Sequence, residues 1–427
     1  MERAISDPSP KILLVNFHST MNAGDLGLLI SAREFLLRAF PSCEIKVSTN
    51  WPDEPAYNEN GFIALPSPWS LSGLNDDISI VQQVRKLLLN VFQLGNTNSR
   101  RTFSPGVDSL RSAYREAELI VSVPGNQFYS SGRFGWPFPV SISGTLLAHR
   151  YRKPLVVLPQ SIGPLKRWWE RALIRKSFGK ARQVYLRDDK SLELAEQIGL
   201  PMEKVYYLPD LALSLLPSEA AQATEVLFNA GVDLEQPKLG VTLISRMNRS
   251  FDSQVMQNYY TEIGKALAGF SKKHTVQIVF FNQVVGPTSV ETDGIPTALV
   301  VNNLREQGAD VFHVDETVTP SLLKACYGQM DAFVATRLHS GIYAIGMAVP
   351  TLFIGYLTKT QGMVRSLQIE DDFLDISVLS EASFGEKLET LWTNRNKKSQ
   401  KLTGVIAHAR QEIARAIELL KKEFDND

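Results

Sequence analysis

The chain lacks several features that would mark a specialised class of protein. Its 427 residues include only two cysteines, Cys43 and Cys326, whose separation gives neither metal-ligand spacing nor a disulfide framework. Basic and acidic residues balance at 45 each, so the positive excess typical of nucleic-acid binders is missing. We therefore expect no nucleic-acid partner. No His pair or carboxylate cluster has metal-binding spacing, so no metal is expected either.

Long apolar runs are also scarce. The longest, residues 341–357, is interrupted by Pro350 and is short for a membrane span. Residues 1–10 contain charges and two prolines, which do not resemble a secretion leader. Hydrophobic content of 44% with charged content of 21% is typical of a soluble globular protein. We expect a cytoplasmic protein, with at most peripheral contact at the inner face of the membrane.

Short apolar runs alternate with helical patterns along most of the chain. Expected strands lie at 12–15, 45–47, 119–123, 154–158 and 184–186, and again at 239–244, 276–281, 310–314, 332–335 and 351–354. Strands that are apolar on both faces and separated by helices predict parallel sheets covered by helices. The length suits two such domains, which we place at 1–215 and 216–400, with a packing helix at 401–427.

Three segments stand out from this alternation. Residues 62–80 and 93–108 are rich in Ser, Pro, Gly and Asn, and are expected to be loops that either bind a ligand or only connect. Residues 165–182 form a basic helix containing tryptophan. This helix could contact anionic lipid or a glycan acceptor, or could simply present a solvated face.

Two doubly wound domains leave a cleft between the carboxyl ends of their strands, where ligands bind. Asn22, Gly24 and Asp25 follow the first strand and precede a helix, whose amide groups attract anions. Asp25 could cap that helix or act as a base. Gly125 and Asn126 follow another buried strand and predict either a ligand loop or a simple tight turn.

Polar residues follow the next two strands as well. Gln160 and Ser161, with Gly163 after them, come after the strand that ends at Leu158. Arg187 follows the strand at 184–186, where it could bind phosphate or carboxylate with two parallel hydrogen bonds. The alternative for Arg187 is an ion pair with a neighbouring aspartate.

The strongest candidate site follows the strand at 332–335. Arg337 and His339 stand at this strand-to-helix junction, and Ser340 and Gly341 open an apolar helix. Arginine binds anions with two donors, and histidine exchanges protons near neutral pH. Lys359, beyond the following strand, could complete an anion pocket or be an ordinary surface lysine.

The order of these motifs resembles the polysaccharide pyruvyl transferase family. An Asn-x-Gly-Asp loop, a Gln-Ser-Ile-Gly-Pro run, Arg-Asp-x-x-Ser, Pro-Asp and Arg-Leu-His follow one another between about residues 11 and 365. Family members often have several glycines and an acidic residue where this chain has Gly125 and Asn126. That departure leaves Asp25 as the expected base toward the acceptor.

The resemblance implies two Rossmann-like domains facing a cleft, similar to two-domain (GT-B-type) glycosyltransferases. It implies transfer of a pyruvyl group from phosphoenolpyruvate to sugar hydroxyls, forming a ketal, with a lipid-linked sugar or polysaccharide precursor as acceptor. By position, Arg337 and His339 match the family's catalytic pair and Arg187 matches a second donor-binding arginine. The acceptor side would be the first domain and the donor side the second.

This reaction needs cations for two anionic groups and one proton donor. Phosphoenolpyruvate is a co-substrate, and no cofactor is expected. The main alternative is a glycosyltransferase that uses a nucleotide sugar, because the architecture would be shared. A non-catalytic sugar-binding relative is a third reading. A homo-oligomer is compatible with the sequence, which does not specify an oligomeric state.

Overall fold

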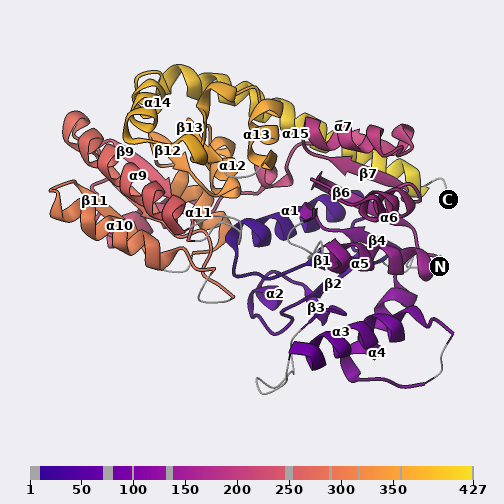
Figure 1. Cartoon of the computed structure of the whole chain (residues 1–427). Coiled ribbons are helices and arrows are strands. Elements are labelled where there is room, and N and C mark those ends of the chain that lie inside the picture. The colour runs from indigo at the N-terminus through magenta and orange to yellow at the C-terminus, as the bar shows by residue number, and fades with distance from the viewer. Residues whose placement is uncertain are drawn as a thin grey trace, which may run out of the picture. The chain divides into compact units, whose positions relative to one another are not determined.

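The computed structural model describes residues 10–70, 80–98, 101–130, 138–245, 253–287, 291–315, 318–355 and 358–425 (Figure 1). Its contacts divide the chain into two compact units. The first comprises Met1–Thr20, Leu28–Pro209 and Ile413–Asp427, and the second Met21–Gly27 and Asp210–Glu412. Each unit therefore contains a segment from the other end of the chain. Met21–Gly27, which follows the first strand, belongs to the second unit, and the carboxyl-terminal Ile413–Asp427 belongs to the first.

The first unit is built on a parallel sheet with the order β3-β2-β1-β4-β6-β7-β8, in which β5 also pairs with β6. Its strands are β1 (Lys11–Phe17), β2 (Glu44–Thr49), β3 (Ile63–Pro66), β4 (Leu119–Ser122), β5 (Gly125–Phe128), β6 (Leu155–Ile162), β7 (Gln183–Leu186) and β8 (Val205–Tyr207). The direction of winding reverses between β1 and β4, as in doubly wound folds.

Helices cover both faces of this sheet. They are α1 (Ala23–Ala39), α2 (Ala56–Glu59), α3 (Ile80–Gly95), α4 (Pro105–Glu116), α5 (Phe138–Arg150), α6 (Trp168–Phe178) and α7 (Asp189–Gln197). Val184 and Leu186 of β7 join the core cluster that includes α4, α5 and α6. Tyr185, between them, points to the opposite face, where its ring contacts Phe35 of α1. This alternation along β7 explains why Val184, Tyr185 and Leu186 are all apolar and buried.

The second unit has a parallel sheet with the order β11-β10-β9-β12-β13-β14. Its strands are β9 (Lys238–Thr242), β10 (Gln277–Phe281), β11 (Val311–Val314), β12 (Ala332–Ala335), β13 (Thr351–Gly355) and β14 (Phe373–Asp375). Numbered within this sheet, the order is 3-2-1-4-5-6, that of dinucleotide-binding folds. Both sheets are therefore doubly wound, which confirms the predicted α/β architecture.

The helices of the second unit are α8 (Ala220–Asn229), α9 (Ser253–His274), α10 (Gly294–Glu306), α11 (Pro320–Tyr327), α12 (Leu338–Gly346), α13 (Thr358–Ser366) and α14 (Glu381–Thr393). Val241 and Val334 pack toward α9, α10 and α14 in one core cluster. On the other face, Phe281 and Phe333 contact the ring of Tyr327 in α11. Helices therefore cover both faces here too.

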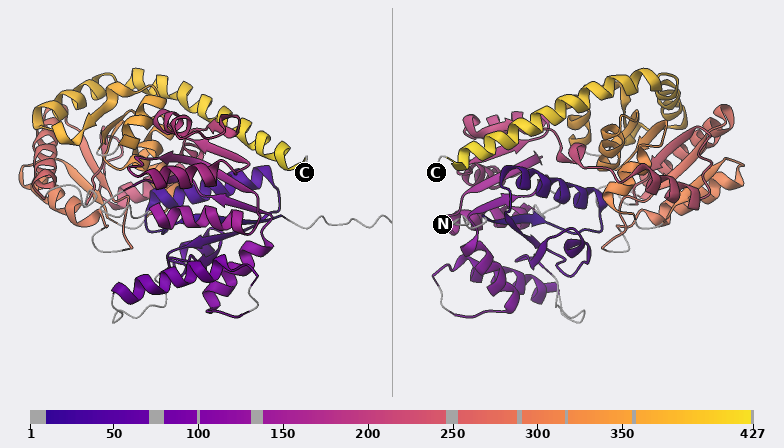
Figure 2. Two further views of the ribbon diagram at one scale, coloured as in Figure 1. Left: turned by 45° about the vertical axis from the view of Figure 1, so that its right-hand side comes forward. Right: turned by 180° about the vertical axis from the view of Figure 1, so that it is seen from behind.

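The chain ends in the long helix α15 (Arg395–Asp425), drawn in yellow in Figure 2. Its residues up to Glu412 belong to the second unit and those from Ile413 onward to the first. Helix 401–427 was expected from the sequence, and the observed helix begins six residues earlier. No helix among the described residues has the length and apolarity required to cross a bilayer.

Two predicted loops contain regular structure. Residues 63–66 form β3, an edge strand, and residues 105–108 form the first turn of α4. Pro105 stands at the start of α4, where its missing N–H group costs nothing. Residues 71–79, 99 and 100 lie outside the described part of the chain. Composition alone therefore overestimated the length of both loops.

Candidate functional site

Arg337 lies at the switch point of the second sheet. The strand order reverses between β9 and β12, and Arg337 follows β12 directly. Helix α12 begins at Leu338, earlier than the sequence suggested, so Arg337 is its N-cap residue and His339 lies in its first turn. Ligands of doubly wound sheets bind outside the carboxyl ends of the strands at such a point.

The guanidinium of Arg337 forms a two-pronged ion pair with Asp293. Nε donates to Asp293 Oδ2 at 3.1 Å and Nη2 to Oδ1 at 2.5 Å. The Asp293 side chain is fully buried, whereas that of Arg337 retains 18% exposure. This geometry fixes the plane of the guanidinium and leaves part of the side chain accessible.

Asp293 is itself held by the backbone. Its carboxylate accepts hydrogen bonds from the amides of Ser245, at 3.2 Å, and Val284, at 3.1 Å. Asp293 was not among the site residues expected from the sequence. Its position offered a signal, because Asp293 falls between the strand β10 and the helix α10, at the same end of the sheet as Arg337.

The ring of His339 is packed between Gly24 and Asp210. A Cβ at Gly24 would lie 2.4 Å from His339 Nδ1, so only glycine fits there. On the other side, Nε2 lies 4.0 Å from Oδ2 of Asp210, whose side chain is fully buried. That separation is within ion-pair range but too long for a hydrogen bond. In the sequence, Asp210 belongs to the Pro-Asp motif and was given no role in the site, yet it lies beside the candidate acid.

The segment carrying Gly24 is held within the second unit by backbone hydrogen bonds. Asn22 forms an isolated antiparallel bridge with Val284, and the amide of Ala23 donates to Gln283 O at 3.0 Å. Tyr343 of α12 donates its hydroxyl to Ala23 O at 2.7 Å. These contacts hold the Asn-x-Gly-Asp motif against the helix that carries His339.

Asn22 and Asp25 support the start of α1. Asn22 Oδ1 accepts from the amide of Gly24 at 2.9 Å, and its Nδ2 donates to Asp25 Oδ2 at 3.0 Å. The helix begins at Ala23, so the motif forms its first turn instead of preceding it. Asn22, not Asp25, provides the side-chain cap. Asp25 remains half-buried in the first turn, in the same unit as His339.

A buried lysine, Lys324, interacts electrostatically with Asp210. Lys324 donates to the carbonyls of Ala212, Leu213 and Leu215, which belong to or follow the short helix η2 (Leu211–Ser214). Burial lowers the pKa of Lys324 to about 7; the charge of Arg410 adds to this effect and Asp210 opposes it. Asp210 caps η2 by accepting from the amide of Ala212 at 2.9 Å.

Burial also raises the pKa of the Tyr343 hydroxyl well above 10.0, and the charges of Asp210 and Asp25 add to the shift. The hydroxyl therefore stays protonated at neutral pH and keeps donating to the loop carrying Gly24.

Ser340 and Gly341 serve packing in the structure. Ser340 is fully buried, its hydroxyl donates to Arg337 O at 2.7 Å, and it shares a hydrogen bond with Thr242 of β9. A Cβ at Gly341 would lie 2.2 Å from the ring of Phe353 in β13. These two residues bring α12 close to the sheet and so fix the positions of Arg337 and His339.

Three predicted donor-binding residues gather in the first unit, at the ends of β6 and β7. Gln160 donates its side-chain amide to Val123 O. Arg187 is fully buried, and its Nε donates to Ser161 Oγ at 3.0 Å. Ser161 in turn donates to Asp188 Oδ2 at 2.6 Å. Ser161 therefore links the buried arginine to its neighbouring aspartate.

The remaining predicted residues have varied settings. Gly125 and Asn126 do not form a turn; they belong to the short strand β5, where Gly125 has φ +148° and pairs with Gln160. Gly163 has φ +89°, a conformation that favours glycine. Lys359 falls within α13, but its side chain lies outside the described residues.

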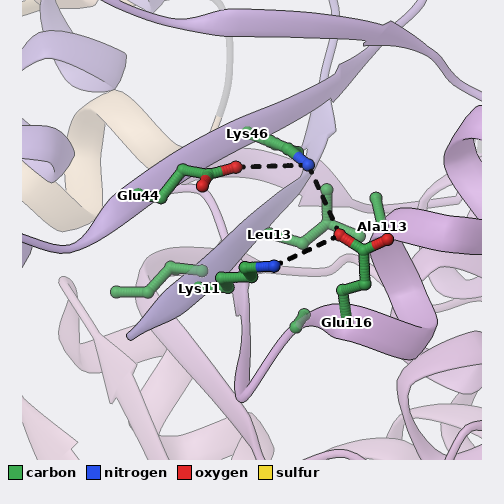
Figure 3. Close-up of a pocket in the computed structure, with 8 residues that line it drawn as sticks. Lys11, Leu13, Glu44, Lys46, Ala113 and Glu116 are labelled. Carbon is green, nitrogen blue, oxygen red and sulfur yellow. Dashed lines mark ion pairs between the residues drawn. The ribbon is translucent and has the colours of Figure 1, made fainter. Parts of the chain in front are cut away.

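A small pocket lies at the opposite end of the first sheet from these motifs (Figure 3). Glu116 of α4 pairs with Lys11 at 3.6 Å and with Lys46 at 3.7 Å, and Lys46 also pairs with Glu44. Its charges compensate one another, so it carries no candidate chemistry. In the part of the chain that the structure describes, no cluster of three metal-binding side chains occurs.

The family model for polysaccharide pyruvyl transferases matches residues 22–358. A relative, the amylovoran biosynthesis protein AmsJ of Erwinia amylovora, is 21% identical over 421 residues, covering 96% of this chain and 95% of AmsJ.

Solved structures share the fold at low sequence identity. HepE from Anabaena, in complex with UDP and glucose, superposes with a TM-score of 0.59 at 12% identity, covering 97% of this chain and 99% of HepE. Sucrose-phosphate synthase from Thermosynechococcus elongatus gives 0.60 at 10% identity, with coverage of 98% and 100%. Both superpositions extend over nearly the whole chain, which agrees with the predicted fold class.

Proposed function

Because the chain belongs to the polysaccharide pyruvyl transferase family, we propose that it transfers a pyruvyl group from phosphoenolpyruvate to a sugar, forming a ketal. A proton is added to the methylene carbon of the donor, which becomes the methyl group. One sugar hydroxyl attacks the neighbouring cationic carbon, phosphate leaves, and a second hydroxyl closes the ring. The two hydroxyl protons balance the methyl proton and the protonated phosphate.

His339 is the proposed general acid. Its position in the first turn of α12 exposes it to the positive end of the helix, which disfavours a protonated ring. The buried carboxylate of Asp210, 4.0 Å from Nε2, has the opposite effect and stabilises the protonated ring. The absence of a Cβ at Gly24 leaves the space that the ring occupies. This arrangement of His339 between Gly24 and Asp210 is the observation that carries the proposal.

Arg337 is the proposed cation for the anionic donor, and Asp293 is its positioning residue. The two-pronged pair holds the guanidinium at the switch point, with part of the side chain accessible. Gln160, Ser161, Arg187 and Lys359 are further donor-binding candidates, and Asp25 is the proposed base toward the acceptor.

The family and the AmsJ relative, named for amylovoran biosynthesis, support a polysaccharide precursor as acceptor. The proposal includes a lipid-linked sugar as one form of that precursor. The donor is consumed at each turnover, so the proposed chemistry requires no separate cofactor. Phosphoenolpyruvate is a cytoplasmic metabolite, and the proposal therefore includes the cytoplasmic location expected from the sequence.

A glycosyltransferase that uses a nucleotide sugar is the second candidate, favoured by the fold shared with HepE in complex with UDP and glucose. A donor panel separates the two. We expect the purified protein to release phosphate from phosphoenolpyruvate only when a sugar acceptor is present, and to add a pyruvyl mass to that acceptor. Transfer from nucleotide sugars, with none from phosphoenolpyruvate, would instead support the second candidate.

A further inference from the structure

Helix α3 (Ile80–Gly95) has an apolar face that is exposed in the described part of the chain. Leu88, Leu89 and Phe92 are 57%, 50% and 73% exposed. Spacings of three and four residues place them on one side of the helix. The opposite side packs inward through Leu87 and Leu94, and Leu94 belongs to the core of the first unit. Core packing therefore explains only one of the two apolar sides.

Positive charge accompanies this face. Arg85 is exposed and stands three, four and seven residues before Leu88, Leu89 and Phe92, so it shares their side of the helix. Lys86 is exposed beside it, and residues 80–95 contain no aspartate or glutamate. In a chain with no net charge, α3 is thus locally cationic.

Two more arginines lie at the carboxyl end of α3. Arg150 donates through Nε to Gly95 O at 2.8 Å, and Arg115 donates through Nη2 to Thr97 O at 2.7 Å. Both side chains are exposed. These contacts anchor the end of the helix to α5 and α4 and extend the cationic surroundings of the apolar face.

Leucine and phenylalanine on one side of a helix, with arginine and lysine beside them, are typical of helices that lie in the interfacial layer of an anionic bilayer. A symmetric contact with a second copy fits less well. Such a contact would bring Arg85 and Lys86 near their counterparts, with no acidic residue on α3 to pair with them.

We propose that α3 docks the protein onto an anionic lipid surface. Leu88, Leu89 and Phe92 enter the boundary between headgroups and acyl chains, and Arg85 and Lys86 contact lipid phosphates. From the sequence, the basic segment 165–182, which contains α6, was the candidate for contact with anionic lipid. That helix exposes one large apolar side chain, Trp168 at 81%, among exposed basic residues. The triad on α3 offers the larger insertion surface, and docking by α3 is independent of the proposed reaction.

Co-sedimentation of the full chain with vesicles tests this. We expect binding to vesicles of phosphatidylcholine mixed with phosphatidylglycerol, weaker binding to phosphatidylcholine alone, and weakening by salt. Leu89→Asp combined with Phe92→Asp should lower the partition coefficient by at least about tenfold. Arg85→Glu with Lys86→Glu should remove the preference for anionic vesicles. Phe228→Asp, on an equally exposed residue of α8, is the matched control.

Several outcomes would overturn the inference. These are absence of vesicle binding by the unaltered protein, unchanged binding by the α3 variants, or loss of binding in Trp168→Asp alone. A dimer in light scattering that Phe92→Asp converts to a monomer would assign the face to a second copy. Turnover on a water-soluble acceptor should be unchanged in every α3 variant. That readout separates failure of docking from failure of the proposed function.

Discussion

The ring of His339 lies against Gly24, 315 positions earlier in the chain, so closely that a Cβ on Gly24 would come within 2.4 Å of Nδ1. The loop of the Asn-x-Gly-Asp motif thus sets the position of the candidate acid, although the two segments are remote in sequence. The loop is held by the bridge between Asn22 and Val284 and by the hydroxyl of Tyr343.

Gly24→Ala should displace the His339 ring and lower turnover by at least about 100-fold, because a positioned acid contributes roughly that much or more. Gly24 lies in the first turn of α1 and has no unusual φ, so alanine introduces a clash without backbone strain. Steady-state kinetics and thermal unfolding would be measured together. Gly269→Ala is the control, since nothing lies within 4 Å of a Cβ there. Equal activity in both variants would contradict the packing argument.

Asp293→Asn should raise the KM for the donor and lower turnover, because the guanidinium of Arg337 loses its charged partner. Removing one member of a buried ion pair also destabilises a protein by about 3–5 kcal/mol, so urea unfolding should detect the change. Arg337→Lys keeps the positive charge and the fold but cannot form the two-pronged pair. If Arg337→Lys had normal donor kinetics, orientation by Asp293 would be unimportant.

Asp210→Asn should change the pH dependence of turnover. The amide can still accept from Ala212, so η2 keeps its cap, but the negative charge near His339 is lost. The protonated ring becomes less stable, and activity should begin to fall at a lower pH than in the unaltered protein. A pH–rate profile with an unmoved alkaline limb would show that Asp210 serves structure alone.

Lys324 should make stability depend on pH. Its pKa is lowered from 10.5 to about 7 in the folded protein, mainly by burial. Between these values the unfolded chain binds more protons, so the unfolding free energy rises with pH; below about 7 the destabilisation is complete. Urea unfolding at pH values between about 6.5 and 9 would reveal how the unfolding free energy of the protein rises with pH. These values cover about the lower half of the range between the two pKa values.

Lys324→Met should remove that part of the slope, whereas Lys265→Met, at an exposed position on α9, should leave it intact. Comparing the variants cancels contributions from cysteines and tyrosines that titrate at high pH. Identical slopes in the unaltered protein and Lys324→Met would mean that Lys324 is charged throughout.

The sequence located the strands well because their apolar runs are local features. It likewise placed Arg337 and His339 at a strand end, since a buried strand precedes them and an apolar helix follows. It assigned Gly125 and Asn126 to a ligand loop or a tight turn because β5 is too short and too polar to show a strand pattern. Residues 63–66 were assigned to a loop for a similar reason.

The partners of the site could not be predicted in the same way. Asp293 and Arg337 are 44 residues apart, and their pairing depends on β10 and β12, which flank β9, ending at one edge of the sheet. Gly24 and Asp210 lie far from His339 in the sequence, and all three belong to the second unit, which comprises Met21–Gly27 and Asp210–Glu412. Such contacts follow from tertiary packing, which no local pattern of residues specifies.

The central claim is that His339 delivers a proton to the methylene carbon of phosphoenolpyruvate during pyruvyl transfer. The most direct measurement is the mass of the product formed in heavy water from phosphoenolpyruvate and a sugar acceptor. We predict a pyruvyl ketal with a single deuterium in its methyl group, and no such product from His339→Ala. A ketal without deuterium, or normal product from His339→Ala, would contradict the account.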